Sequence, residues 1–218
     1  MSDANSTVLI IDDDADLRAS VGRLLRSLGI NVQLFASIAD FLASDPPKGP
    51  TCLVLDVRLP GQSGLDLQRE LAAAKKEIPI IFITGHGDIP MTVQAMKGGA
   101  IEFLTKPFRD QDLLDAIQLG LSRDAARREN DKDLAVLRER FASLSSRERE
   151  IVIQVARGRL SKQIAFDIGI AEATVKVHRS RAMQKMNAGS LPELGRMADK
   201  LKLVPELQQR SSSNERRR

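Results

Sequence analysis

The chain of 218 residues contains a single cysteine, Cys52, and has no tryptophan and no tyrosine. One cysteine excludes an internal disulfide framework. Without Trp and Tyr, stacking of single-stranded bases on aromatic platforms fits the chain poorly. No segment has the pattern of a signal peptide or is apolar for long enough to cross a membrane. We therefore expect a soluble, cytosolic protein with no membrane partner.

The net charge of +4 conceals an asymmetry between two halves. Residues 1–122 hold 11 Lys and Arg against 16 Asp and Glu, whereas residues 123–218 hold 22 against 13. The halves thus carry −5 and +9, and the chain is long enough for two domains. A basic half beside an acidic one predicts a module that binds a polyanion, joined to a module that does not.

In the acidic half, short apolar runs alternate with stretches that have helical spacing, such as ADLRASVGRLLRSLG. The runs are TVLII (7–11), INVQLF (30–35), CLVLD (52–56), IPIIFIT (78–84) and IEFL (101–104). Runs without polar alternation are typical of parallel strands, which are covered on both faces. The pattern predicts an α/β fold with a doubly wound, five-stranded parallel sheet.

Aspartates follow two of these runs: Asp12, Asp13 and Asp14 follow the first, and Asp56 ends the third. Ligands bind at the carboxyl ends of strands in open parallel sheets. In the flavodoxin-like strand order 2-1-3-4-5 the first and third strands are neighbours, so Asp12, Asp13 and Asp56 would converge. Adjacent carboxylates repel one another unless a cation offsets them, and Mg²⁺ suits such a set.

Two further strand ends supply other chemical groups. Thr84 ends the fourth run with a hydroxyl, and Lys106 follows the fifth with an ammonium. Magnesium, hydroxyl and ammonium could together hold an oxyanion, as phosphoryl transfer to a carboxylate requires. Asp56 is then the natural nucleophile. Each residue alone also has an ordinary structural explanation, such as a helix N-terminal charge or a surface lysine, and only their joint order favours a site.

The segments IIDDD, VLDVRLPGQSGLDL, IFITGHGDIP and IEFLTKPF resemble the receiver domain of bacterial two-component response regulators. The resemblance implies that a sensor histidine kinase phosphorylates Asp56. It also implies that Asp13 binds Mg²⁺ directly, that Asp12 acts through water and that the backbone carbonyl of Arg58 completes the protein ligands. The remaining roles that it implies are a switch hydroxyl at Thr84, a switch aromatic at Phe103, a phosphoryl partner at Lys106 and a cis peptide bond at Lys106–Pro107.

A long helical stretch runs from Asp110 to about Arg140, from the acidic half into the basic half, and its charged middle (Arg123–Lys132) predicts a solvated connector. Ser145 and Glu148 then have the spacing of a capping box. The segment RLSKQIAFDIGIAEATVKVHRSRAMQKM predicts a helix, a tight turn at residues 169–171 and a second helix. In a helix-turn-helix that second helix enters the major groove, although a basic helix alone can equally be a solvated face.

The string LSSREREIVIQVARGRLSKQIAFDIGIAEATVKVHR, with SLPEL beyond it, resembles the LuxR-type DNA-binding domain. Together with a receiver this is the FixJ/NarL class, and the segments GHGDIPMTVQAMKGGAIEF and SLPELGRMA resemble its FixJ-like members. The resemblance implies that Lys176, Val177 and Ser180 face base edges, and that Thr174, His178 and Arg179 contact mainly the DNA backbone. Ser180 replaces a basic residue found in some relatives.

These observations predict a receiver over residues 1–122, a helical linker over 123–142, a helix-turn-helix domain over 143–205 and a disordered basic tail over 206–218. Phosphorylation of Asp56 is expected to drive homodimerisation, promoter binding and, with RNA polymerase, activation of transcription. The chain would turn over no other substrate. Two alternatives are a DNA-binding regulator independent of phosphorylation and a Mg²⁺-dependent phosphohydrolase. The latter lacks the expected second carboxylate, because position 58 is Arg.

Overall fold

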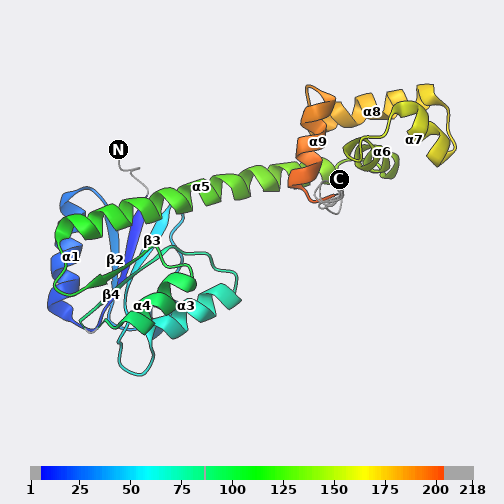
Figure 1. Cartoon of the computed structure of the whole chain (residues 1–218). Coiled ribbons are helices and arrows are strands. Elements are labelled where there is room, and N and C mark those ends of the chain that lie inside the picture. Colours follow the sequence, from blue (N-terminus) through cyan, green and yellow to red (C-terminus); the bar gives the residue numbers. More distant parts are fainter. Residues whose placement is uncertain (1–5, 86, 204–218) are drawn as a thin grey trace, which may run out of the picture. The chain divides into compact units, whose positions relative to one another are not determined.

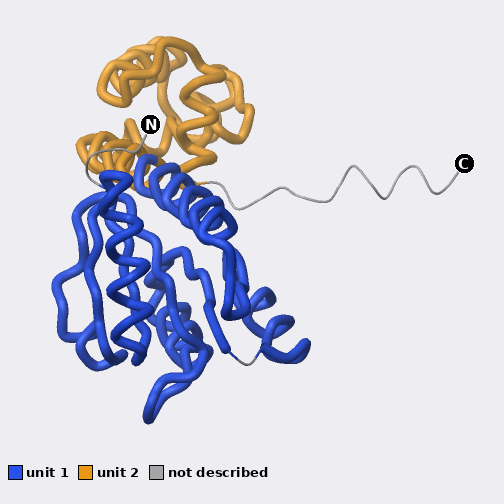
Figure 2. Tube along the Cα trace, turned by 90° about the vertical axis from the view of Figure 1, so that its left-hand side faces the viewer, with its two compact units in different colours: residues 1–129 blue, residues 130–218 orange. Residues whose placement is uncertain are grey.

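The computed structural model describes residues 6–85 and 87–203. The chain divides into two compact units, residues 1–129 and 130–218 (Figure 2). The division falls within the stretch that the sequence predicts as a helical linker. The predicted tail over 206–218, and His86 of the GHGD segment, lie outside the described residues.

Unit 1 is built on a parallel sheet of five strands in the order β2-β1-β3-β4-β5, which confirms the predicted fold (Figure 1). In this order Ile11 pairs with Leu55, so the carboxyl ends of β1 and β3 lie side by side. The strands are β1 (Thr7–Ile11), β2 (Asn31–Phe35), β3 (Thr51–Asp56), β4 (Ile80–Thr84) and β5 (Glu102–Thr105).

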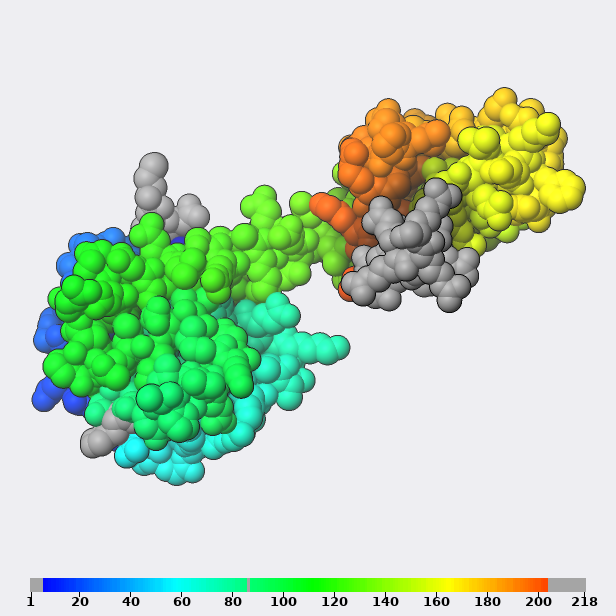
Figure 3. Space-filling model, in the orientation of Figure 1, coloured from blue at the N-terminus to red at the C-terminus, as the bar shows by residue number. Residues whose placement is uncertain are grey.

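Helices cover both faces of this sheet (Figure 1). One apolar cluster packs residues of α2, α3 and α4 against the sheet, and a second packs residues of α1 and α5 against the opposite face. Figure 3 shows the surface that α4, β5 and α5 form, in green. The helices are α1 (Ala15–Ser27), α2 (Ile38–Leu42), α3 (Gly64–Ala73), α4 (Ile89–Lys97) and α5 (Asp110–Ala142).

The expectation that every strand is covered on both faces holds for three strands only. All residues of β1, β3 and β4 are buried, whereas β2 and β5 contain exposed residues. The reason is their position, because β2 and β5 are the two edges of the sheet and the helices cover them incompletely. Residues at the edges, such as Phe103, are therefore only partly buried.

The sequence predicted that the charged middle of α5 is a solvated connector. This is wrong for Asp124, because its side chain is buried. Its Oδ2 accepts hydrogen bonds from the backbone N–H of Thr51 at 2.9 Å and from Arg128 Nε at 2.6 Å. Its Oδ1 accepts from Arg127 Nη2 at 2.5 Å. Charged side chains are buried when they are paired, and here the pairing fastens α5 to the first residue of β3.

One turn earlier, α5 passes very close to the same strand. A Cβ at Gly120 would lie 2.6 Å from the Sγ of Cys52, closer than van der Waals contact permits. Cys52 is fully buried, and burial raises the pKa of its thiol to about 12. Gly120 and Asp124 therefore fix the register of α5 along β3.

In unit 2 the end of α5 packs with shorter helices around two apolar clusters, and Leu137 of α5 belongs to the first cluster. The shorter helices follow α5 in the chain. They are α6 (Ser146–Ala156), α7 (Ser161–Ile168), α8 (Glu172–Met186) and α9 (Leu191–Lys200). The predicted helix, turn and helix are α7 and α8, joined through Gly169, which adopts the left-handed φ of +70°. The predicted capping box of Ser145 and Glu148 opens α6.

We expect Gly120→Ala to destabilise unit 1 by about 1 to 3 kcal/mol, because the added methyl overpacks the contact with Cys52. Urea unfolding of the full chain, followed by circular dichroism, measures the effect. Gly195→Ala is the control, because a Cβ there has nothing within 4 Å in α9. Removing the thiol with Cys52→Ala should relieve part of the cost of Gly120→Ala; equal costs in both backgrounds would contradict the proposed contact.

Candidate functional site

Three carboxylates meet at the carboxyl ends of β1 and β3. Asp12, Asp13 and Asp56 each offer one carboxylate oxygen, and these oxygens all lie within 4.8 Å of one another. Asp12 and Asp56 are buried, whereas Asp13 is exposed. The sequence predicted this convergence from the strand order. Oxygen ligands at this spacing suit a hard divalent cation.

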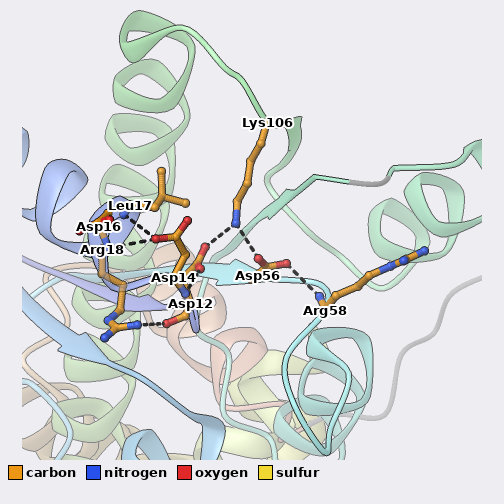
Figure 4. Close-up of polar contacts among 8 residues, drawn as sticks. All are labelled: Asp12, Asp14, Asp16, Leu17, Arg18, Asp56, Arg58 and Lys106. Atoms are coloured by element: carbon orange, nitrogen blue, oxygen red, sulfur yellow. Dashed lines mark hydrogen bonds and ion pairs between the residues drawn. The ribbon is translucent and has the colours of Figure 1, made fainter.

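Lys106 connects two of these carboxylates (Figure 4). Its Nζ lies 2.7 Å from Asp12 Oδ2 and 2.6 Å from Asp56 Oδ2. Burial disfavours the ammonium, but the hydrogen bonds to both carboxylates outweigh burial and raise the pKa of Lys106. Burial also raises the pKa of Asp12. Lys106 therefore supplies part of the positive charge that the acidic cluster requires.

The third member of the DDD motif has a different task. Asp14 is the N-cap of α1, and its Oδ1 accepts hydrogen bonds from the backbone N–H groups of Asp16 and Leu17. The hydrogen bond from Leu17 is the main cause that lowers the pKa of Asp14. Asp12 Oδ1 accepts from Asp14 N at 2.8 Å, and Arg18 Nη1 donates to the backbone oxygen of Asp12 (Figure 4). These bonds hold the loop that carries Asp13.

The loop after β3 holds Asp56 in a similar way. Asp56 Oδ1 accepts a hydrogen bond from Arg58 N at 2.9 Å, and the Arg58 side chain points away from the carboxylates (Figure 4). A Cβ at Gly64 would overlap the backbone carbonyl of Asp56, so only glycine allows α3 to begin here. Sequence reasoning missed the role of Gly64, although its place in the PGQSG segment marks a tight turn.

Thr84 and Phe103 lie on the two strands beyond β3. Thr84 is fully buried at the carboxyl end of β4, and its backbone oxygen accepts a hydrogen bond from Lys106 N at 2.8 Å. The Phe103 ring lies 6.3 Å from that of Phe82, centroid to centroid. The peptide bond between Lys106 and Pro107 is cis, as the resemblance implied. Thr84 and Lys106 thus lie at the same end of the sheet, whereas Phe103 pairs with Phe82, two residues before the end of β4.

In unit 2, α8 packs through one face and exposes another. Val175 and Ala182 are fully buried, whereas Val177 is 49% exposed. Of the residues predicted to contact DNA, the exposed ones are Thr174, Lys176, Val177 and Ser180, and the partly buried ones are His178 and Arg179. Lys176 forms an ion pair with Glu172 at 2.9 Å. The basic, outward face of α8 is the candidate nucleic-acid interface.

An ion pair between the buried carboxylate of Glu148 and the exposed ammonium of Lys185 holds α8 against α6. Glu148 Oε2 lies 2.7 Å from Lys185 Nζ and accepts from Ser145 N at 2.8 Å. The hydrogen bond from Lys185, followed by that from Ser145, lowers the pKa of Glu148 from 4.5 to about 2. The sequence predicted the cap at Ser145, but the partner 37 residues away is visible only in the structure.

An acidic site at the carboxyl end of a five-stranded parallel sheet, followed by a helix-turn-helix, defines a receiver joined to a DNA-binding module. Comparison with family models agrees: residues 8–118 match the response regulator receiver domain, and residues 142–198 match the bacterial regulatory proteins of the luxR family. The chain belongs to the two-component response regulators that carry a receiver and a LuxR-type DNA-binding domain.

Named relatives cover most of the chain. Nodulation protein W of Bradyrhizobium diazoefficiens is 53% identical over 89% of this chain and 86% of that protein. Transcriptional regulatory protein FixJ of Rhizobium meliloti is 43% identical over 88% of this chain and 94% of its own length. The solved structure of response regulator StyR is 49% identical, with a TM-score of 0.79 over 90% of this chain and 99% of that one. Among the described residues, no helix has the length and apolar character needed to span a membrane.

The pair of Glu148 and Lys185 should make unit 2 sensitive to acid. Because the folded pKa of Glu148 is about 2 against an ordinary 4.5, its stabilisation is complete above about pH 4.5 and is lost as the pH falls through about 2. At pH 7, Glu148→Gln should lower the free energy of unfolding by roughly 1.5 to 3 kcal/mol. The variant should also lose less stability between pH 4.5 and pH 2 than the natural chain does.

Urea unfolding of the full chain at both pH values measures these effects. Glu150→Gln is the matched control, because Glu150 lies in the same helix and its ion pair with Arg147 is solvent-exposed. Equal losses for the two variants would show that Glu148 contributes no more than a surface charge.

Proposed function

We propose that the chain is phosphorylated on Asp56 by a sensor histidine kinase and that this modification controls binding to promoter DNA. The observation that carries the proposal is the meeting of Asp12, Asp13 and Asp56 with Lys106 at one end of the sheet. A structural ion pair seldom places three carboxylates around one ammonium. A site that binds a divalent cation and a phosphoryl group, in contrast, needs several carboxylates for the cation and an ammonium for the phosphoryl oxygens.

The residues available to hold Mg²⁺ are the carboxylates of Asp12, Asp13 and Asp56 and the backbone carbonyl of Arg58. The ion would neutralise charge on the incoming phosphoryl group. A carboxylate oxygen of Asp56 attacks phosphorus, the new O–P bond forms as the P–N bond to the kinase histidine breaks, and the electron pair stays on the imidazole. Lys106 Nζ, already beside Asp56, then pairs with a phosphoryl oxygen, and the Thr84 hydroxyl donates to another.

The same event would alter the surface formed by α4 and β5. The phosphoryl group adds charge of about −2, which draws Thr84 and Lys106 inward and lets Phe103 and α4 adopt a second arrangement. In support, α4 exposes apolar side chains, among them Ile89 at 80%, Val93 and Met96. Such an apolar face is suited to pairing with a second receiver, so we propose that phosphorylation produces a homodimer.

Two paired receivers would bring two helix-turn-helix units to two half-sites, which raises affinity through effective concentration. We assign the receiver to residues 1–122, the linker to 123–142 and the DNA-binding domain to 143–205. Within α8, the exposed Lys176, Val177 and Ser180 would meet base edges. The bound dimer would activate transcription with RNA polymerase, and the chain would act on no other substrate.

We expect acetyl phosphate and Mg²⁺ to attach one phosphate covalently to the natural chain, and Asp56→Asn to abolish it. Mass spectrometry detects the added mass. Chelation of Mg²⁺ should also prevent labelling, because the carboxylates would then lack their cation. Asp66→Asn is the control, because Asp66 is a solvent-exposed residue of α3 whose partner is Arg69.

The same samples test regulation. Phosphorylated natural chain should dimerise and bind a promoter duplex at least tenfold more tightly at fixed salt, whereas Asp56→Asn should not respond. Sedimentation velocity and fluorescence anisotropy of labelled DNA measure the two effects. Equal DNA affinity in both proteins would favour the phosphorylation-independent alternative, and steady release of phosphate from small esters would favour the phosphohydrolase.

A further inference from the structure

Arg179 does not extend freely from α8. Its Nη1 donates a hydrogen bond of 2.8 Å to the Oγ of Ser161, the first residue of α7. Both side chains are partly buried. The bond therefore joins the two helices of the helix-turn-helix through side chains that are 18 residues apart in the sequence.

Arg179 lies on α8 at a position from which its guanidinium can reach DNA. Val175 and Ala182, four residues before and three residues after it, are fully buried, whereas Lys176 and Ser180 are exposed. Arg179 thus stands at the border between the packed face of α8 and its basic outward face. A guanidinium at this border can reach a phosphate beside the groove while its stem stays packed.

The chemistry of the pair leaves donors free for an anion. A guanidinium carries five N–H donors, and the bond to Ser161 uses one of them. Ser161 Oγ serves as the acceptor in this bond, so its own O–H can donate elsewhere. An arginine fixed in one rotamer loses less conformational entropy on binding than a free one.

We propose that Ser161 is a positioning residue for DNA binding: its hydroxyl holds the Arg179 guanidinium in the orientation that contacts a backbone phosphate. This inference rests on the proposed DNA-binding role of α8 and adds a residue that the recognition helix does not contain. Ser161 acts through Arg179, so its contribution disappears when Arg179 is absent.

The test is a double-mutant cycle on the full chain, with a generic 30-base-pair duplex whose binding is measured by anisotropy over a range of salt concentrations. Ser161→Ala should weaken binding by roughly threefold to tenfold, the range of one hydrogen bond. Arg179→Ala should weaken it further and lower the salt slope by about 1, because one phosphate contact is lost. In the Arg179→Ala background, Ser161→Ala should have no further effect.

Two variants separate positioning from folding. Ser161→Thr keeps the hydroxyl, so its affinity for DNA should return from the level of Ser161→Ala to that of the natural chain. If Ser161 had a purely structural role, affinity would not depend on the hydroxyl. Ser146→Ala is the matched control, because Ser146 is also the first residue of a helix and is exposed. Thermal unfolding should be the same for Ser161→Ala and Ser146→Ala.

The inference is overturned if Ser161→Ala binds DNA as the natural chain does, or if it weakens binding equally with and without Arg179. Failure of Arg179→Ala to change affinity or salt slope would also overturn it, while leaving the rest of the DNA interface intact. If the natural chain bound no duplex at low salt, the proposed function itself would fail, so the two failures are distinguishable.

Discussion

Mutual repulsion among carboxylates at the ends of β1 and β3 is the constraint on which the receiver unit depends. Parallel strand order alone brings Asp12 and Asp56 together, and burial of both makes their charge costly. Lys106 offsets part of that cost through two short ion pairs. Three carboxylates and one ammonium still leave a formal charge of −2. A single divalent cation neutralises this excess, so the arrangement favours a cation of charge +2 over a second lysine.

The strand that carries Asp56 at one end is held at its other end by α5. Thr51 opens β3 and donates its N–H to the buried Asp124, while Cys52 lies against Gly120. These contacts keep α5 in register with β3 along about two turns that contain five charged residues, Arg123, Asp124, Arg127, Arg128 and Glu129. The charged composition of this part of α5 therefore serves attachment to the sheet as well as solubility.

Much of this arrangement could be predicted from the sequence because it depends on local patterns. Unbroken apolar runs gave the strands, and the order of Asp12, Asp56 and Lys106 at their ends gave the acidic site. The helix-turn-helix was evident because Gly169 interrupts two amphipathic segments. Each of these inferences needs only the periodicity of a segment and the identity of the residue that ends it.

The features that sequence reasoning missed are contacts between distant residues. Asp124 was assigned to a solvated connector because its neighbours are charged, yet one of its partners is a backbone N–H 73 residues away. Arg179 was assigned to the DNA backbone and Lys185 was given no role, but Arg179 bonds to Ser161 and Lys185 to Glu148. A backbone donor leaves no trace in composition, and a charged residue gives no sign of which partner it will meet.

These distant contacts also divide the basic residues of α8 into two functional kinds. Lys185 is committed to Glu148, whose carboxylate has a strongly lowered pKa, so this cation supports the fold and is a poor candidate for releasing counterions from DNA. Lys176 pairs with Glu172 at an exposed site, where the pair is worth little and can exchange for a phosphate. Net charge therefore overstates the DNA-binding capacity of the helix, because only cations held by weak or neutral partners remain available to the nucleic acid.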